Sequence, residues 1–171
     1  MFNQFNDDDI WKALKDVQMD QKILEHKDGI MQEINETAFS VGQKQLICLA
    51  RALIQKTKII VLDEATANVD LITDNLIQST LRQKFFDNPD DRTTVLIIAH
   101  RIVSVIDADR ILVMSDGAKK EYDHPYKLLA ACDGDNSITS TSLFAQMVKA
   151  TGEETAQGLL KIAKKKYEQA K

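Results

Sequence analysis

The chain has 171 residues, of which 44% are hydrophobic and 28% charged, and this composition suits one α/β domain with a buried core. Its formal net charge of −4 argues against a protein that grips a nucleic-acid backbone, because such proteins usually carry a basic surplus. No apolar run approaches the roughly 18 residues of a membrane span, the acidic start does not resemble a secretory signal, and two cysteines make no disulfide framework.

Helical and strand patterns alternate from the start of the chain. Two short helices are expected within residues 7–26, opened by an acidic cluster. The segment 41–54 is apolar on nearly every side, which predicts a buried helix. Residues 59–62 form an apolar run that is typical of a parallel strand covered on both faces, and this run ends at Asp63 and Glu64.

The same alternation continues in the second half of the chain. A long helix is expected over 70–86 and another buried strand over 94–99, which stops at His100. Because strands alternate with helices, we expect a parallel α/β sheet, with 110–114 as a third strand. The remaining predicted pieces are an extended segment at 119–122, helices at 125–131 and 143–149, and a polar, lysine-rich helix at 153–171 that is expected to be a solvated tail, or else to contact a membrane surface.

Asp63 and Glu64 place two carboxylates at the carboxyl end of a predicted strand, where α/β folds gather their ligands. Mg²⁺ on a nucleotide prefers oxygen ligands, so Asp63 is a candidate metal ligand, directly or through water. Glu64 is then placed to polarise an attacking water as general base. The alternative is an acidic strand end that only caps the next helix or turn. When the motif is considered alone, this alternative is the preferred interpretation.

Ser40 precedes the predicted helix at 41–54 and is placed as its N-cap. The free N–H groups of the first turn then point outward at the positive end of the helix dipole, where a phosphate can bind. Gly42 permits a close approach of the backbone, and the Ser40 hydroxyl and the Gln43 amide add polar contacts. A plain capped helix is the commoner explanation of an isolated Ser-x-Gly, just as His100, taken alone, is more often a core or edge histidine than a catalytic one.

The order and spacing of these segments are similar to those of ABC transporter ATPase domains. From Phe39 the chain reads Phe-Ser-Val-Gly-Gln-Lys-Gln-Leu-Ile-Cys-Leu-Ala-Arg-Ala-Leu, and from Ile60 it reads Ile-Val-Leu-Asp-Glu-Ala-Thr-Ala-Asn-Val-Asp. The segments around His100 and after Asp109 belong to the same resemblance, which covers about residues 2–152 and is strongest to the C subfamily, the multidrug-resistance-protein-like transporters.

The resemblance implies a partial P-loop NTPase-type parallel sheet flanked by helices, with part of the ABC helical subdomain, over residues 1–152, and a polar terminal helix or tail over 153–171. In this family the signature motif, which corresponds to Ser40–Gln43 in this chain, contacts the γ-phosphate of ATP held by the opposite ATPase domain. The roles that carry over are nucleotide contact for Ser40, Val41, Gly42 and Gln43, and a D-loop role at the nucleotide-binding site for Asp70. They also include Mg²⁺ binding for Asp63, general-base action for Glu64 and γ-phosphate sensing for His100.

Two departures from the family pattern bear on function. Phe39 and Val41 stand where the broader ABC signature has Leu and Gly, although Val at this place suits the C subfamily. The P-loop motif needs a second glycine five residues after the first, and none of the six glycines has one there. We therefore expect the isolated chain to be inactive as an ATPase.

The expected function is that of an ATP-binding and hydrolysis half-module of an ABC transporter that energises transmembrane solute export. The resemblance implies ATP and Mg²⁺ as cofactors, a second ABC ATPase domain and transmembrane domains absent from this chain as partners, no nucleic acid, and a location at the cytoplasmic face of a membrane. If the chain is complete, the missing P-loop favours an alternative, a non-catalytic dimerising or regulatory fragment that donates its signature motif to a partner ATPase domain. A chromosome-maintenance or DNA-repair ATPase shares the motif order, but the acidic balance and the lack of a long heptad run argue against it.

Overall fold

The computed structural model describes residues 5–35, 38–63, 69–86, 93–99, 101–132 and 134–170. Glu64 and His100, the two residues expected to act in catalysis, lie outside these ranges. The chain divides into two compact units, Met1–Ile98 and Ala99–Lys171, and each is described by itself. Within the described ranges no helix has both the length and the apolar character that crossing a lipid bilayer requires.

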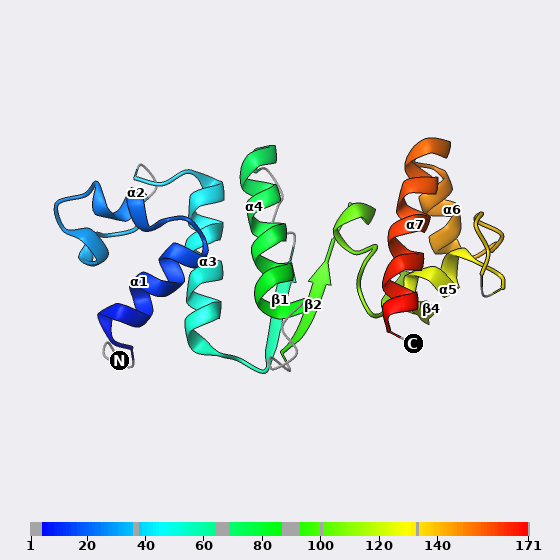
Figure 1. Ribbon diagram of the computed structural model, residues 1–171, viewed down its shortest axis with the longest axis horizontal. Helices are drawn as coiled ribbons and strands as arrows, with labels where there is room; N and C mark the ends of the chain where they lie inside the picture. Colours follow the sequence, from blue (N-terminus) through cyan, green and yellow to red (C-terminus); the bar gives the residue numbers. More distant parts are fainter. Residues whose placement is uncertain are drawn as a thin grey trace. The chain divides into compact units, whose positions relative to one another are not determined.

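Helices pack on one face of a pair of parallel strands in the first unit (Figure 1). The strands pair with Ile59 beside Thr94 and Asp63 beside Ile98, so their carboxyl ends lie at the same edge. This arrangement confirms the α/β class that the alternation of strands and helices predicts. In chain order the elements are α1 (Asp7–Asp16), α2 (Asp20–Leu24), the 3₁₀ helix η1 (Gly29–Met31), α3 (Val41–Gln55), β1 (Ile59–Asp63), α4 (Leu71–Leu81), the π-helical turn η2 (Arg82–Phe86) and β2 (Thr94–Ile98).

The core of the first unit lies where α1, α3, α4 and one face of β1 meet. α1 begins after Asn6, whose side chain accepts a hydrogen bond from the Asp9 amide at 2.8 Å. α3 buries one face rather than its whole surface as predicted, since Val41 and Cys48 are exposed. Residues three and four apart share a helix face, so a single stripe of each helix fills this core. The buried apolar residues include Leu14, Val17, Leu46, Leu49, Ala50, Ile60, Ile77, Leu81 and Phe85.

The two strands of the first unit are covered on one face only, which corrects the prediction that both faces are buried. Ile60 is 7% exposed, whereas Ile59 and Val61, on the opposite face of β1, are 62% and 60% exposed. Leu96 and Ile98 of β2 lie on the same open face. A continuous apolar run indicates that both faces suit burial, but the described helices pack on only one of them.

The second unit contains an antiparallel hairpin rather than a further parallel strand. β3 (Ile111–Ser115) pairs with β4 (Ala118–Asp123), and the turn between them has positive φ angles of 53° at Asp116 and 71° at Gly117. Two consecutive positive φ angles are typical of a type I′ hairpin turn, which Asp-Gly favours. The third strand predicted at 110–114 is confirmed as β3, but the expectation that it joins a parallel sheet is wrong. The other elements of this unit are η3 (Ile102–Ser104), α5 (Pro125–Leu129), α6 (Leu143–Lys149) and α7 (Glu153–Gln169).

The C-terminal helix α7 packs into the core of the second unit. Leu160 and Ala163 are 1% and 0% exposed, in a cluster with apolar residues of α5 and α6. Lys164 Nζ donates hydrogen bonds to Gly134 O at 2.9 Å and to Asn136 Oδ1 at 2.7 Å, which tie the helix to the loop that precedes α6. The expectation of a solvated tail is therefore wrong, because one narrow apolar stripe is enough to dock an otherwise lysine-rich helix.

Candidate functional site

The start of α3 is closed by a reciprocal pair of hydrogen bonds. Ser40 Oγ accepts a hydrogen bond from the Gln43 amide at 3.2 Å, and Gln43 Oε1 accepts one from the Ser40 amide at 3.0 Å. This capping box fixes the first turn of the helix, because each bond satisfies a donor that the helix itself cannot pair. The prediction that Ser40 is the N-cap of this helix is confirmed.

The capping box uses the side-chain oxygens of Ser40 and Gln43 as acceptors, so hydrogen-bond donors remain available at the start of α3. Its bonds use a lone pair of Ser40 Oγ and the carbonyl oxygen of the Gln43 side chain, so the Ser40 hydroxyl hydrogen and the Gln43 NH₂ group can still donate. The amides of Val41 and Gly42 belong to the first turn and have no intrahelical acceptor. A set of donors at the positive end of a helix of 15 residues suits an anion such as a phosphate.

Gly42 faces the start of the neighbouring helix α4. A methyl group on its Cα would lie 2.8 Å from Thr73 Cγ2 and 2.9 Å from Val69 Cγ1, which is closer than carbon atoms pack. Any larger residue at this position therefore displaces its neighbours. The sequence predicts that the missing side chain lets a phosphate approach the backbone, whereas in the structure that space is bordered by Val69 and Thr73.

Asp70 caps α4 with both oxygens of its carboxylate. Oδ1 accepts hydrogen bonds from the amides of Ile72 at 3.1 Å and Thr73 at 3.0 Å, and Oδ2 accepts one from Thr73 Oγ1 at 2.7 Å. The Thr73 amide and hydroxyl are the main causes that hold the pKa of Asp70 below its ordinary value. The charged carboxylate thus neutralises the positive end of α4. The start of α3, which the neutral Ser40 caps, keeps its attraction for an external anion.

The structure brings the predicted nucleotide-facing residues Ser40–Gln43 close to Asp70. Figure 1 shows α3 and α4 side by side, and the contact of Gly42 with Thr73 places their first turns together. Exposed apolar side chains belong to the same helix starts, with Leu71 68% and Ile72 83% exposed. A polar donor set next to exposed apolar side chains suits a site that a second protein surface covers.

Asp63 lies exposed at the end of β1, beside Ile98 at the end of β2. Glu64 and His100 follow these two strand ends in the sequence and lie outside the described residues. Within the described ranges, no three His, Cys, Asp or Glu side chains are gathered so that they could hold a metal ion. Asp63 stays a predicted Mg²⁺ ligand, since nucleotide sites commonly hold Mg²⁺ with one or two carboxylates and take the remaining ligands from phosphate and water.

The sequence pattern does not single out Val69 or Thr73 as parts of this site. For Thr73 a local signal exists, because the residue three positions after an N-cap aspartate donates its amide to that cap. The contact of Thr73 with Gly42 has no such signal, since it joins residues of two helices.

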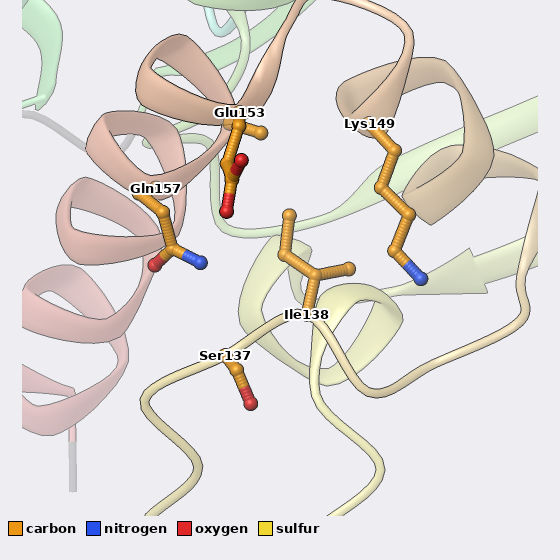
Figure 2. Close-up of a pocket in the computed structure, with 6 residues that line it drawn as sticks. Ser137, Ile138, Lys149, Glu153 and Gln157 are labelled. Atoms are coloured by element: carbon orange, nitrogen blue, oxygen red, sulfur yellow. The ribbon is translucent and has the colours of Figure 1, made fainter.

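A separate hollow of about 290 Å³ lies in the second unit, beside α6 and α7. Figure 2 shows Ile138 between Lys149 on one side and Glu153 and Gln157 on the other. None of the site residues predicted from the sequence lines this hollow, so it has no part in the candidate site.

Comparisons with known proteins cover the residues of the candidate site. Residues 3–67, which include the start of α3 and the end of β1, match the family model described as ABC transporter. The chain is 41% identical over 169 residues to the probable multidrug resistance-associated protein lethal(2)03659 of Drosophila melanogaster, a match that covers 98% of the chain. It is 44% identical over 168 residues, 97% of the chain, to the human ATP-binding cassette sub-family C member 4. ABC transporter C family member 3 of Arabidopsis thaliana is 44% identical over 145 residues, which cover 84% of the chain and 9% of that protein.

These relatives are much longer than the chain, which spans 11% of the fly protein and 12% of the human protein. The similarity nevertheless extends over nearly all of this chain and so includes both helix starts and both strand ends described above. The chain therefore belongs to the ABC transporter ATP-binding domains, and among them it is of the C-subfamily type that these relatives represent.

Proposed function

We propose that residues 1–152 act as the ATP-binding and hydrolysis half-module of an ABC transporter that energises transmembrane solute export, with 153–171 as an appended terminal helix. The observation that carries this proposal is the capped start of α3, where hydrogen-bond donors remain beside the Asp70-capped start of α4. The family membership supports the transporter context, because the relatives are named as ABC transporters and multidrug-resistance-associated proteins.

The start of α3 would contact the γ-phosphate of ATP that a second ABC ATPase domain holds. Ser40 and Gln43 would contribute side-chain donors, and Val41 and Gly42 would contribute backbone amides. The exposed apolar side chains at the start of α4 support a protein partner for this surface. Asp70 would act on that partner or on its own helix rather than on phosphate, since two anions repel each other.

Asp63 would hold Mg²⁺ at the end of β1, supported by its exposure and its place at a strand end. Bound Mg-ATP supplies the γ-phosphoryl group and the divalent charge that neutralises it. Glu64 would orient and deprotonate the attacking water, and His100 would donate a hydrogen bond to developing charge. For these last two residues the support is their order in the sequence after β1 and β2.

The transmembrane domains of the transporter, which are not part of this chain, would place the module at the cytoplasmic face of a membrane. The acidic net charge of −4 gives no support to a nucleic-acid partner. The alternative function is that of a non-catalytic dimerising or regulatory fragment. Such a fragment donates the start of α3 to a partner ATPase domain and hydrolyses no ATP itself. The sequence favours this alternative only in that none of its six glycines begins a P-loop pattern.

A chimera tests the proposal, in which this chain replaces the matching segment of the human ATP-binding cassette sub-family C member 4. Ser40→Asp and Ser40→Asn form a matched pair, because both residues cap helices well and only one carries a negative charge. We expect the Asn chimera to retain much of its ATP hydrolysis and the Asp chimera to lose it, since Asp repels the phosphate. Equal hydrolysis by both variants, at the rate of the unsubstituted chimera, would overturn the proposal.

The same chimera separates the two functions. A hydrolytic half-module loses ATP turnover with either Ser40→Asp or Glu64→Gln. A fragment that only donates its signature surface loses turnover with Ser40→Asp and keeps it with Glu64→Gln.

A further inference from the structure

Thr73 contacts both halves of the candidate site. Its amide and its hydroxyl donate hydrogen bonds to the two carboxylate oxygens of Asp70, at 3.0 Å and 2.7 Å. Its methyl carbon Cγ2 borders the space that a side chain on Gly42 would occupy, at 2.8 Å. One half-buried side chain therefore touches the cap of α4 with its polar branch and the first turn of α3 with its apolar branch.

The hydroxyl and the methyl group of Thr73 are bonded to the same Cβ atom, so they cannot move independently. A β-branched residue in a helix also has restricted rotation about χ1, which holds both branches in place. Serine would keep the bond to Asp70 and lose the contact with Gly42, and valine would do the reverse. Among these three residues, only threonine makes both contacts at this position.

We propose that Thr73 is a positioning residue that holds the first turn of α3 and the carboxylate of Asp70 in one fixed arrangement. The inference rests on the proposed function, in which these two helix starts face ATP and a partner domain. Its consequence is mechanical: the hydrogen-bond donors of Ser40–Gln43 are aimed by a contact from a different helix, and a disturbance at Asp70 reaches them through a single side chain. Tight packing transmits such a shift because no empty space lies between the contacting atoms.

The first test uses the full chain and a pair of substitutions across the contact. Gly42→Ala introduces a methyl group 2.8 Å from Thr73 Cγ2, and Thr73→Ser removes that carbon. We expect Gly42→Ala to lower the Tm, and to lower it less when Thr73→Ser is already present. The remaining loss reports the contacts with Val69 Cγ1 at 2.9 Å and with Cβ of residue 73 at 3.3 Å. Strictly additive effects of the two substitutions would overturn the proposal.

The second test reads position rather than stability, by NMR of the full chain. Thr73→Val should shift the amide resonances of Val41 and Gly42 and raise the pKa of Asp70, because the carboxylate loses a hydrogen bond to its charged form. Ser79→Ala is the matched control, since it removes a hydroxyl of the same helix whose hydrogen bond within the described part of the chain is to the local Leu76 O at 2.9 Å. Equal amide shifts in both variants would contradict a positioning role.

The third test is the rate of the chimera. Thr73→Val should lower kcat by about tenfold, the size expected for a lost hydrogen bond to a charged group, and change KM by less than about twofold. Thr73→Ser should also lower kcat, because it keeps the bond to Asp70 but loses the contact with Gly42, and Ser79→Ala should leave the rate unchanged.

The outcomes separate this inference from the proposed function. If Ser40→Asp abolishes hydrolysis while Thr73→Val hydrolyses as fast as Ser79→Ala, the function stands and the positioning role falls. If Ser40→Asp has no effect, the proposed function falls. If Thr73→Val does not fold, the substitution pair of Gly42 and Thr73 decides alone.

Discussion

The ring centroids of His124 and Tyr167 lie 5.1 Å apart, so the N-cap residue of α5 packs against the C-terminal helix α7. His124 Nδ1 accepts a hydrogen bond from the Tyr126 amide at 3.1 Å, and its Nε2 is buried without a hydrogen-bond partner among the described residues. An acceptor at Nδ1 requires the neutral imidazole with its proton on Nε2. Burial, followed by the positive charge of Arg110, lowers the pKa of His124.

This lowered pKa predicts that the free energy of unfolding falls at mildly acidic pH. The unfolded chain binds a proton at His124 near the ordinary pKa of about 6.5, whereas the folded chain binds it only at lower pH. The contribution is therefore complete above pH 6.5 and is lost as the pH falls from there through the folded pKa. Denaturant unfolding between pH 7.5 and 5 measures it.

The control for this pH dependence is a variant of His124 itself. His124→Asn keeps an N-cap acceptor and removes the titration, so the slope between pH 6.5 and 5 should flatten. Identical slopes in the variant and the unsubstituted protein would show that His124 does not control the effect.

Glu64→Gln in the chimera should preserve ATP binding and lower turnover by roughly 10² to 10⁴, the range of a positioned general base. Glutamine keeps the size of glutamate but cannot accept the proton of the attacking water. Metal binding should survive through Asp63, which this change does not touch. Steady-state hydrolysis and nucleotide-binding assays on the same preparation check both statements, and turnover near that of the unsubstituted chimera would remove Glu64 from the base role.

His100→Ala should reduce hydrolysis by about 3 kcal/mol of transition-state stabilisation, by analogy with donors that face developing negative charge. The loss should exceed that of His26→Ala, whose exposed imidazole lies in the first unit. It should also exceed that of His124→Ala, although this variant loses the cap of α5 and so needs a folding measurement beside the rate. Comparable losses in all three variants would indicate general destabilisation.

Local signals predicted well those parts of the structure that local chemistry decides. Ser40 is an N-cap because its hydroxyl binds an amide three residues away, which the sequence pattern contains in full. The exposure of Ile59 and Val61 on one face of β1 could not be predicted from the sequence. An apolar run indicates that both faces of a strand suit burial, but it does not indicate which elements pack against each face. Likewise, alternation along 110–114 suits either direction of pairing, and the Asp116-Gly117 turn is what decides for a hairpin.

The part of the candidate site that the sequence could not give is the contact between the two helix starts. Ser40–Gln43 and Asp70 are each recognisable as a helix start, but nothing local says that Gly42 lies against Thr73. Such contacts depend on how α3 and α4 pack. The glycine at position 42 therefore has a reason in helix packing that is separate from any role toward phosphate.

The chain by itself should bind Mg-ATP very weakly and show no measurable ATP hydrolysis. P-loop proteins hold a triphosphate with a cradle of backbone amides and a lysine, and none of the six glycines of this sequence begins that pattern. The start of α3 supplies one anion-attracting helix end, which contributes only modestly, while Asp70 already neutralises the start of α4 and the carboxylate of Asp63 repels phosphate unless Mg²⁺ intervenes. Isothermal titration of the folded chain with Mg-ATP decides the matter, with Ser40→Asp as the control for binding at α3. Micromolar affinity that survives Ser40→Asp would contradict this account and require a nucleotide site elsewhere in the chain.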